Sequence, residues 1–299
     1  MLWSGGSRVT ERPERRWPLL RDPDLRRRLE RDGFLRLPFL SPGAVARLEE
    51  LWSSLGPPIV EGIYSNLHDQ PPDCNRNVND VIAEVFEEPL RRLFVDAVIG
   101  GSSFLVKGCG EQSASTLHQD WCVVDEDRAG SLSMWVPLVD VDEDNGALQV
   151  LPGTHRMRRS IRSFDTLSRY LDFEEAGDLA VCVRASAGDV VLYAHDLFHG
   201  SQPNWTNRVR VAAVAGLVAS DTGLCHYRAT GPTVDDFERL DVDWDFFEKD
   251  IAVLASGGEI VRRGVPCRVN RHLLDVEEVL AHARQHRQSL NRGLVDSND

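Results

Sequence analysis

The stretch that decides the fold runs from Ser115 to Arg156: STLHQDWCVVDEDRAGSLSMWVPLVDVDEDNGALQVLPGTHR. Apolar residues alternate along residues 132–138 and again along 147–151, and an Asp-Asn-Gly turn at 144–146 separates the two runs. Alternation with a period of two is typical of strands that bury one face, and Asn-Gly is a strong turn signal. The stretch therefore predicts a strand, a hairpin turn and a second strand.

A histidine and an aspartate near the start of this stretch, His118 and Asp120, are two residues apart. In extended backbone such residues point to the same face, so both side chains can reach one ion. His199 follows His118 by 81 residues, after residues 187–193, which predict a turn leading into a strand. Two histidines and one carboxylate on one face of an iron, with open positions opposite, are the ligands of non-haem Fe(II) oxygenases. The order of the motifs supports a metal hypothesis that HxD alone would not.

The composition limits the class of protein. A formal charge of −13 argues against nucleic acid or anionic membrane as a partner, because both favour basic patches. The six cysteines are scattered without a CxxC pair, and no apolar run approaches the length of a membrane span. We expect an acidic cytoplasmic protein with reduced thiols, either a monomer or a homodimer.

The chain is expected to form one domain over residues 1–299. Short alternating strands broken by Gly, Pro and Asp turns indicate a double-sheet jelly roll, so the predicted fold is α+β with a mainly β core and flanking helices. The expected parts are a loosely held arm (1–21), an N-terminal helical flank (22–102), the jelly-roll core (103–219) and a C-terminal helical extension (220–299).

Helical spacing and capping residues predict helices over residues 22–31, 41–55, 79–99 and 275–288, and one that opens at Thr233. Pro89 is expected to break the third of these helices. Residues 60–78 are polar and rich in turn residues, which suits either a lid or an ordinary surface loop. Residues 158–178 are charged and expected to be partly helical.

An arginine is predicted to lie inside the core. Basic and apolar residues alternate from Arg208 to Ala212, so Arg210 can point inward from a strand. Its guanidinium suits a bidentate pair with a carboxylate, and a buried arginine without an anion is costly. An inward Arg210 therefore predicts an acidic ligand. Arg208 shares the strand parity and is a rival for this role.

Three motifs together resemble the phytanoyl-CoA dioxygenase family: HQD at 118–120, SMWVPLVDVDEDNGALQVLPGTHR at 133–156 and HGSQPNWTNRVR at 199–210. The resemblance covers roughly residues 30–220. This family consists of Fe(II)- and 2-oxoglutarate-dependent oxygenases built on a double-stranded β-helix, another name for the jelly roll. Its members couple the decarboxylation of 2-oxoglutarate to succinate with the oxidation of a substrate by dioxygen.

The resemblance implies a role for each matching residue. His118, Asp120 and His199 would bind iron, Arg210 would bind the distal carboxylate of 2-oxoglutarate with help from Ser201, and Trp135 would line the pocket. Halogenating relatives lack the carboxylate at the position of Asp120, so hydroxylation is expected here. Desaturation and ring closure by the same oxidising centre remain alternatives.

Other side chains carry weaker expectations. Lys107 precedes the HQD motif and either contacts 2-oxoglutarate or substrate, or is solvated. His155 is read as structural rather than as a substrate contact, and His195 as structural or as a residue behind the metal ligands. The arginines at 158, 159 and 162 suit an acidic substrate or carrier phosphate, or are solvated.

The family does not fix the substrate. We expect a small molecule of specialised natural-product metabolism, amino-acid-like or bound to a carrier. Two other classes are kept as rivals: a jelly-roll module that binds metal without oxidising anything, and a cupin-like metal dioxygenase that needs no 2-oxo acid.

Overall fold

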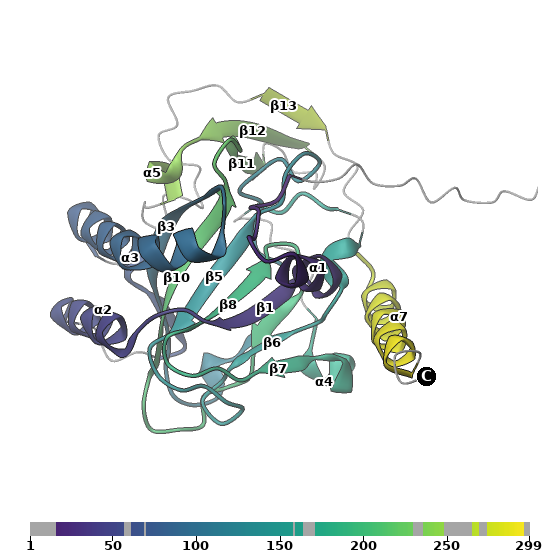
Figure 1. Cartoon of the computed structure of the whole chain (residues 1–299), viewed down its shortest axis with the longest axis horizontal. Coiled ribbons are helices and arrows are strands. Elements are labelled where there is room, and N and C mark those ends of the chain that lie inside the picture. The colour runs from purple at the N-terminus through teal and green to yellow at the C-terminus, as the bar shows by residue number, and fades with distance from the viewer. Residues whose placement is uncertain are drawn as a thin grey trace, which may run out of the picture.

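The computed structural model describes residues 16–56, 61–68, 70–157, 159–163, 171–229, 236–247, 265–268 and 274–295. Two antiparallel sheets enclose the core (Figure 1). The larger sheet has the order β1 (Phe34–Pro38), β8 (Asp189–Ala194), β5 (Leu132–Pro137), β10 (Arg210–Ala219), β3 (Ala97–Lys107) and β2 (Ile63–Ser65). The smaller has the order β4 (Ser115–His118), β9 (His199–Ser201), β6 (Leu148–Val150) and β7 (Val181–Val183). This confirms the predicted jelly-roll core with flanking helices.

Three helices lie along the larger sheet: α1 (Pro23–Asp32), α2 (Pro42–Ser54) and α3 (Pro72–Leu93). The first two begin where the sequence predicts, because Asp22 and Ser41 accept main-chain N–H groups of the first helical turn. Helices α2 and α3 bury Leu48, Ile82 and Phe86 completely against the sheet. Burial of this apolar face, at roughly 25 cal/mol per Å², stabilises the layer of helices on the sheet.

The remaining elements are short or C-terminal. They are the 3-10 turns η1 (Asn66–His68), η2 (Glu111–Ser113), η3 (Thr154–Arg156) and η4 (Gly177–Leu179), helices α4 (Phe173–Ala176), α5 (Trp244–Phe247) and α7 (Val276–Val295), and a three-stranded sheet of β11 (Leu224–Ala229), β12 (Asp236–Val242) and β13 (Val265–Arg268). In Figure 1 this third sheet lies at one end of the molecule and α7 stands at the side.

The predicted hairpin at the Asp-Asn-Gly turn is wrong. Strand β5 pairs with β8 and β10 in the larger sheet, whereas β6 pairs with β7 and β9 in the smaller one. Alternation shows that each strand buries one face, but it does not show which strand is its partner. The turn carries the chain from one sheet to the other.

The prediction for α3 is also wrong in two respects. The helix starts at Pro72, so the polar stretch before it contains β2, η1 and the first turn of α3 rather than one long loop. It also continues through Pro89 to Leu93. Phe86 and Leu90 are buried on either side of the proline, and this packing offsets the lost main-chain hydrogen bond.

Two terminal regions differ from expectation. Residues 16–21 are packed rather than loosely held, since Leu20 is buried and the Arg16 N–H donates to the Arg128 carbonyl; residues 1–15 lie outside the described part. Beyond residue 220 the described residues form strands β11 to β13 before α7, so this extension is not helical throughout. Thr233 lies outside the described residues, and Asp236, expected inside a helix, begins β12.

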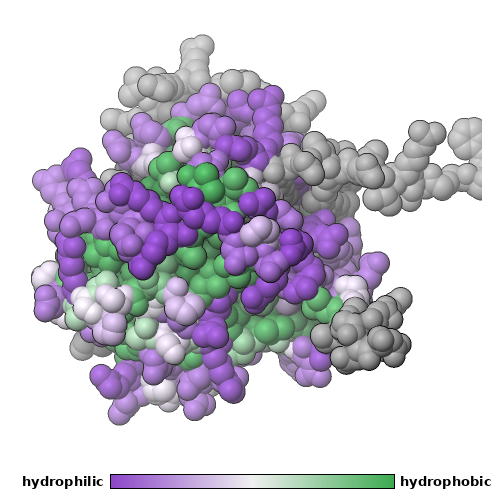
Figure 2. All heavy atoms as spheres, in the orientation of Figure 1, coloured by the Kyte–Doolittle hydropathy of each residue, from purple (hydrophilic) through white to green (hydrophobic). Residues whose placement is uncertain are grey.

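The surface is mixed in character. Figure 2 shows hydrophilic side chains around the rim of one face and hydrophobic ones gathered in its middle. Among the described helices, none has the length and apolarity that crossing a membrane requires.

Candidate metal centre

The two histidines of the predicted metal site meet across the smaller sheet. His118 ends β4, His199 begins β9, and the two are direct register partners, with ring centroids 4.6 Å apart. Asp120 follows β4 by two residues and turns its carboxylate toward both rings. Its Oδ1 atom lies 3.9 Å from Nε2 of His118 and 3.6 Å from Nε2 of His199.

The ligand atoms of these three residues lie within 4.8 Å of one another. Among the described residues, this is the one group of three or more histidine, cysteine, aspartate or glutamate side chains close enough to share a metal ion. Two imidazole nitrogens and one carboxylate oxygen are the donor set of a facial triad for Fe(II). The chemistry of the donors therefore fits the metal that the sequence predicts.

Further hydrogen bonds orient each of these side chains. Nδ1 of His118 donates to the Thr116 carbonyl at 2.8 Å, and Nδ1 of His199 donates to the Leu197 carbonyl at 3.0 Å. The Ser133 hydroxyl donates to Oδ2 of Asp120 at 2.9 Å. Both Nε2 lone pairs and Oδ1 are thereby left to face a common point, which is the role that outer contacts play in metal sites.

Burial sets the charge of these groups. It lowers the pKa of His199 to about 4, so this imidazole is neutral at physiological pH and its Nε2 lone pair is available. Burial acts to raise the pKa of Asp120, but the imidazoles of His199, His195 and His118 outweigh it and hold that pKa below its usual value. A neutral imidazole and an ionised carboxylate are the forms that bind metal.

Arg210 begins β10 on the inner face of the larger sheet and is 2% exposed. Its Nη1 donates to the Gly146 carbonyl at 2.6 Å, and its Cζ lies 4.9 Å from the centre of the Trp135 ring. Its Nε has no hydrogen-bond partner, and no carboxylate of the described residues pairs with it. Burial lowers the pKa of Arg210 to about 9. A buried guanidinium in this condition is complementary to an anion from outside the chain.

Gly146, at the end of the Asp-Asn-Gly turn, makes this arrangement possible. Its φ of +75° favours glycine, and a Cβ there would lie 2.7 Å from both the Gln202 carbonyl oxygen and Cδ of Lys107. The turn can therefore press its carbonyl onto Arg210 only because it carries no side chain.

Lys107 is the register partner of Arg210 and is completely buried, so the solvated alternative is wrong. Its ammonium donates to the carbonyls of Ser113 and Gln202, the second at 3.0 Å. Burial and the neighbouring Arg210 lower the pKa of Lys107 to about 7. Two cationic groups thus lie side by side, and a carboxylate placed between them would favour the charged form of both.

The other predicted site residues take different positions. The indole Nε1 of Trp135 is buried without a hydrogen-bond partner, beside Arg210. Ser201 is buried two residues along β9 from His199. Arg208, the rival of Arg210, is exposed. The structure thus brings His118, Asp120 and His199 together and buries Arg210, while leaving Arg208 at the surface.

Sequence reasoning missed Tyr193. Its ring centroid lies 4.4 Å from that of His199, and its phenol hydrogen-bonds the same Ser133 hydroxyl that donates to Asp120. Burial raises the pKa of this phenol well above its usual value, so it stays protonated. The available signal was a tyrosine at the end of the apolar strand that leads to His199.

Two other histidines are held by main-chain or hydroxyl groups. Nε2 of His155 donates to the Glu30 carbonyl at 3.0 Å, which ties η3 to α1. Nδ1 of His195 lies 2.7 Å from the Ser131 hydroxyl, and its carbonyl accepts the N–H of Asp120 at 2.9 Å. Both arrangements fit the structural interpretation of these residues.

The arginines expected to be solvated or to meet an acidic ligand do neither where they are described. Arg162 is 1% exposed and paired with Glu126, and Arg159 pairs with Asp127. Arg158 lies outside the described residues.

Comparisons with known proteins agree with this geometry. A sequence profile of the phytanoyl-CoA dioxygenase (PhyH) family matches residues 58–212. No curated protein matches the chain. Among solved structures, the epimerase SnoN in complex with Fe3+, alpha ketoglutarate and nogalamycin RO is 21% identical, with a TM-score of 0.52 over 83% of this chain and 96% of that chain.

Two further solved structures are similar. AviO1 from Streptomyces viridochromogenes Tue57 is 21% identical, with a TM-score of 0.46 over 66% of this chain and 94% of that chain. HygX from Streptomyces hygroscopicus, with nickel and 2-oxoglutarate bound, is 16% identical, with a TM-score of 0.49 over 67% of this chain and 88% of that chain.

Proposed function

The chain belongs to the phytanoyl-CoA dioxygenase family of Fe(II)- and 2-oxoglutarate-dependent oxygenases, and on that premise we propose that it hydroxylates a C–H bond of a small molecule. The observation that carries the proposal is the pairing of two features on facing sheets. Ligand atoms of His118, Asp120 and His199 converge within 4.8 Å, and Arg210 is buried without a carboxylate partner.

In this proposal the protein holds and orients the reactants. His118 and His199 bind the iron through Nε2 and Asp120 binds it through Oδ1. Arg210 binds the distal carboxylate of 2-oxoglutarate, and Ser201, Lys107 and Trp135 line the space around it. Bound iron supplies the activation of dioxygen that is coupled to the conversion of 2-oxoglutarate to succinate and CO2.

Asp120 bears on the outcome of the oxidation. A carboxylate that occupies a metal position leaves no place there for halide, which favours hydroxylation over halogenation. The fold alone does not select hydroxylation, because SnoN, which shares it, is an epimerase. Desaturation and ring closure are therefore the alternative outcomes.

The substrate we propose is a small molecule of natural-product metabolism. The similar structure of SnoN was solved in complex with such a compound, nogalamycin RO. The net charge of −13 supports a small molecule rather than nucleic acid.

The test is succinate formation by the purified protein with Fe(II), 2-oxoglutarate and dioxygen, while candidate substrates are screened for stimulation. His118→Ala is expected to abolish it, and Arg208→Met, at an exposed position, should leave it intact. Mass spectrometry of the product separates gain of one oxygen atom from loss of two hydrogens. Binding of metal and 2-oxoglutarate without succinate would favour the non-catalytic module, and substrate oxidation unaffected by Arg210→Met would favour a dioxygenase that needs no 2-oxo acid.

A further inference from the structure

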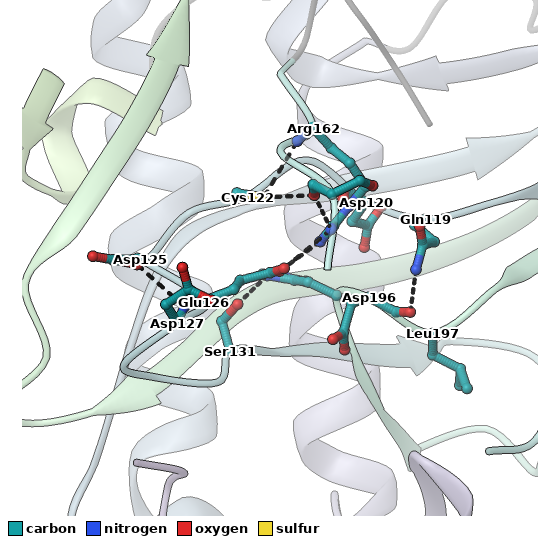
Figure 3. Close-up of polar contacts among 12 residues, drawn as sticks. Gln119, Asp120, Cys122, Asp125, Glu126, Asp127, Ser131, Arg162, Asp196 and Leu197 are labelled. Atoms are coloured by element: carbon teal, nitrogen blue, oxygen red, sulfur yellow. Dashed lines mark hydrogen bonds and ion pairs between the residues drawn. The ribbon is translucent and has the colours of Figure 1, made fainter. Parts of the chain in front are cut away.

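A second buried arginine lies directly behind the metal centre. Arg162 is 1% exposed, and its side chain ends among acceptors from three separate segments (Figure 3). Its Nε donates to the Asp120 carbonyl at 2.6 Å, its Nη1 to the Ser160 carbonyl at 2.8 Å, and Nη1 and Nη2 both donate to the carboxylate of Glu126. Every nitrogen of the guanidinium is thereby used.

These contacts join two stretches of chain. Glu126 lies in the loop between Asp120 and β5, and Arg162 lies in the segment that follows η3. The Cys122 N–H donates to the Arg162 carbonyl at 2.9 Å, and the Arg162 N–H donates to the Cys122 sulfur at 3.4 Å. The main chain of residues 120–122 is therefore held against that of residues 160–162.

Asp120 is the residue that this arrangement holds most completely. Its N–H donates to the His195 carbonyl, its carbonyl accepts from Arg162, and its Oδ2 accepts from Ser133. Of its polar atoms only Oδ1 is left for the histidine Nε2 atoms. Fixing the peptide on both sides limits the directions in which the carboxylate can point.

Stability alone does not account for this choice of residues. A buried ion pair costs so much desolvation that replacing both partners with apolar groups is often neutral or stabilising. A hydrophobic pair in this position would also fill the space, but it could not donate to the Asp120 carbonyl. The feature that only a guanidinium supplies is a rigid fork that pairs with Glu126 while its Nε reaches the metal-ligand loop.

We propose that Arg162, fixed by Glu126, is a positioning residue that sets the orientation of Asp120 toward the metal. The proposal rests on the proposed function, in which Asp120 is a metal ligand. Arg162 does not touch the metal or 2-oxoglutarate. Its effect passes through one hydrogen bond to the main chain of Asp120.

The experiment compares Arg162→Met with the double variant Arg162→Met/Glu126→Leu. The single variant leaves Glu126 buried and unpaired, so it should be much less stable than the wild type. The double variant removes both charges and should recover most of that stability. Metal binding should not recover with it: the dissociation constant for Co(II), followed by visible absorption, is expected to stay at least about 10-fold weaker, the effect of losing an outer contact of a metal ligand.

Two controls keep the outcomes distinct. Arg36→Met removes an ion pair between β1 and β8, and should leave Co(II) affinity and the absorption spectrum unchanged. Arg162→Lys keeps the charge opposite Glu126 but not the fork, so it should stay folded and still bind Co(II) more weakly with an altered spectrum.

The results divide the two proposals. Wild-type protein that binds no Co(II) at His118, Asp120 and His199 overturns both. Wild-type binding with unchanged affinity and spectrum in the folded double variant overturns the positioning role alone. If the double variant does not fold, unchanged Co(II) binding by Arg162→Lys overturns the positioning role instead.

Discussion

Two arginines are buried to the same extent but in opposite circumstances. Arg162 is 1% exposed and forms a two-pronged pair with Glu126, whereas Arg210 is 2% exposed and bonds only the Gly146 carbonyl. Burial acts to lower the pKa of both. The charges around Arg162, Glu126 among them, outweigh burial and raise its pKa, while the pKa of Arg210 falls to about 9. The first cation is neutralised within the chain, and the second is neutralised only by a ligand.

The largest expected effect comes from unpairing the internal partner. Arg162→Met leaves the Glu126 carboxylate buried without a cation, so the free energy of unfolding should fall by about 3–5 kcal/mol. Urea denaturation of the metal-free protein measures it. A fall of less than about 1 kcal/mol would mean that Glu126 finds water or another donor, and the contrast with Arg210 would disappear.

The next effect is on ligand binding rather than on stability. Arg210→Met removes a charge that has no partner, so the free energy of unfolding should change by no more than about 1 kcal/mol. The affinity for 2-oxoglutarate, measured by anaerobic calorimetry on metal-loaded protein, should fall at least about 30-fold, since losing one partner of a buried charge pair costs about 2 kcal/mol or more. Arg208→Met is the matched control and should bind 2-oxoglutarate normally.

A smaller effect concerns pH and sharpens the account of the unneutralised region. The pKa of Lys107 is about 7 in the folded protein against an ordinary value of 10.5, so between these values the unfolded chain binds more protons. The free energy of unfolding of the ligand-free protein should therefore rise with pH from about 7 to 10 through this group. Urea denaturation at several pH values should show a shallower rise in Lys107→Met. Equal slopes in the two proteins would refute the assignment.

The smallest effect belongs to an arginine at the surface. Arg36, half-exposed, pairs with Asp189 at 2.8 Å between β1 and β8. Exposed ion pairs contribute about 0–1 kcal/mol, so Arg36→Met should lower the free energy of unfolding by no more than that. Denaturation at low and high salt measures it, and the difference should shrink as salt screens the pair. A cost as large as that of Arg162→Met would show that burial is not what separates these arginines.

The sequence predicted features that depend on local residue order. Asp22 and Ser41 identified the starts of α1 and α2, and the alternation around Arg210 indicated an inward side chain. It failed where a distant partner decides the outcome. The strands on either side of Asn145 look like a hairpin until β8, β9 and β10 claim them for separate sheets, and Pro89 looks like a helix breaker until the sheet packs against its helix.

The candidate site shows the same division. The spacing of His118 and Asp120 was visible in the sequence, and so was the strand before His199. Arg162 could not be singled out, because nearly all basic residues of this chain are arginines and nothing local links it to Glu126 or Asp120. The role of Tyr193 depends likewise on Ser133, a residue of the neighbouring strand that the sequence does not connect to it.

The pairing of β4 with β9 has a consequence for how the molecule opens. These strands lie 81 residues apart and meet at His118 and His199, so an ion bound to both would staple the edge of the smaller sheet shut. Deuterium uptake by main-chain amides of β4 and β9 should then slow when metal is added, while that of β1 stays the same. Fraying of this edge and departure of the ion become a single event, and the metal doubles as a latch on the barrel.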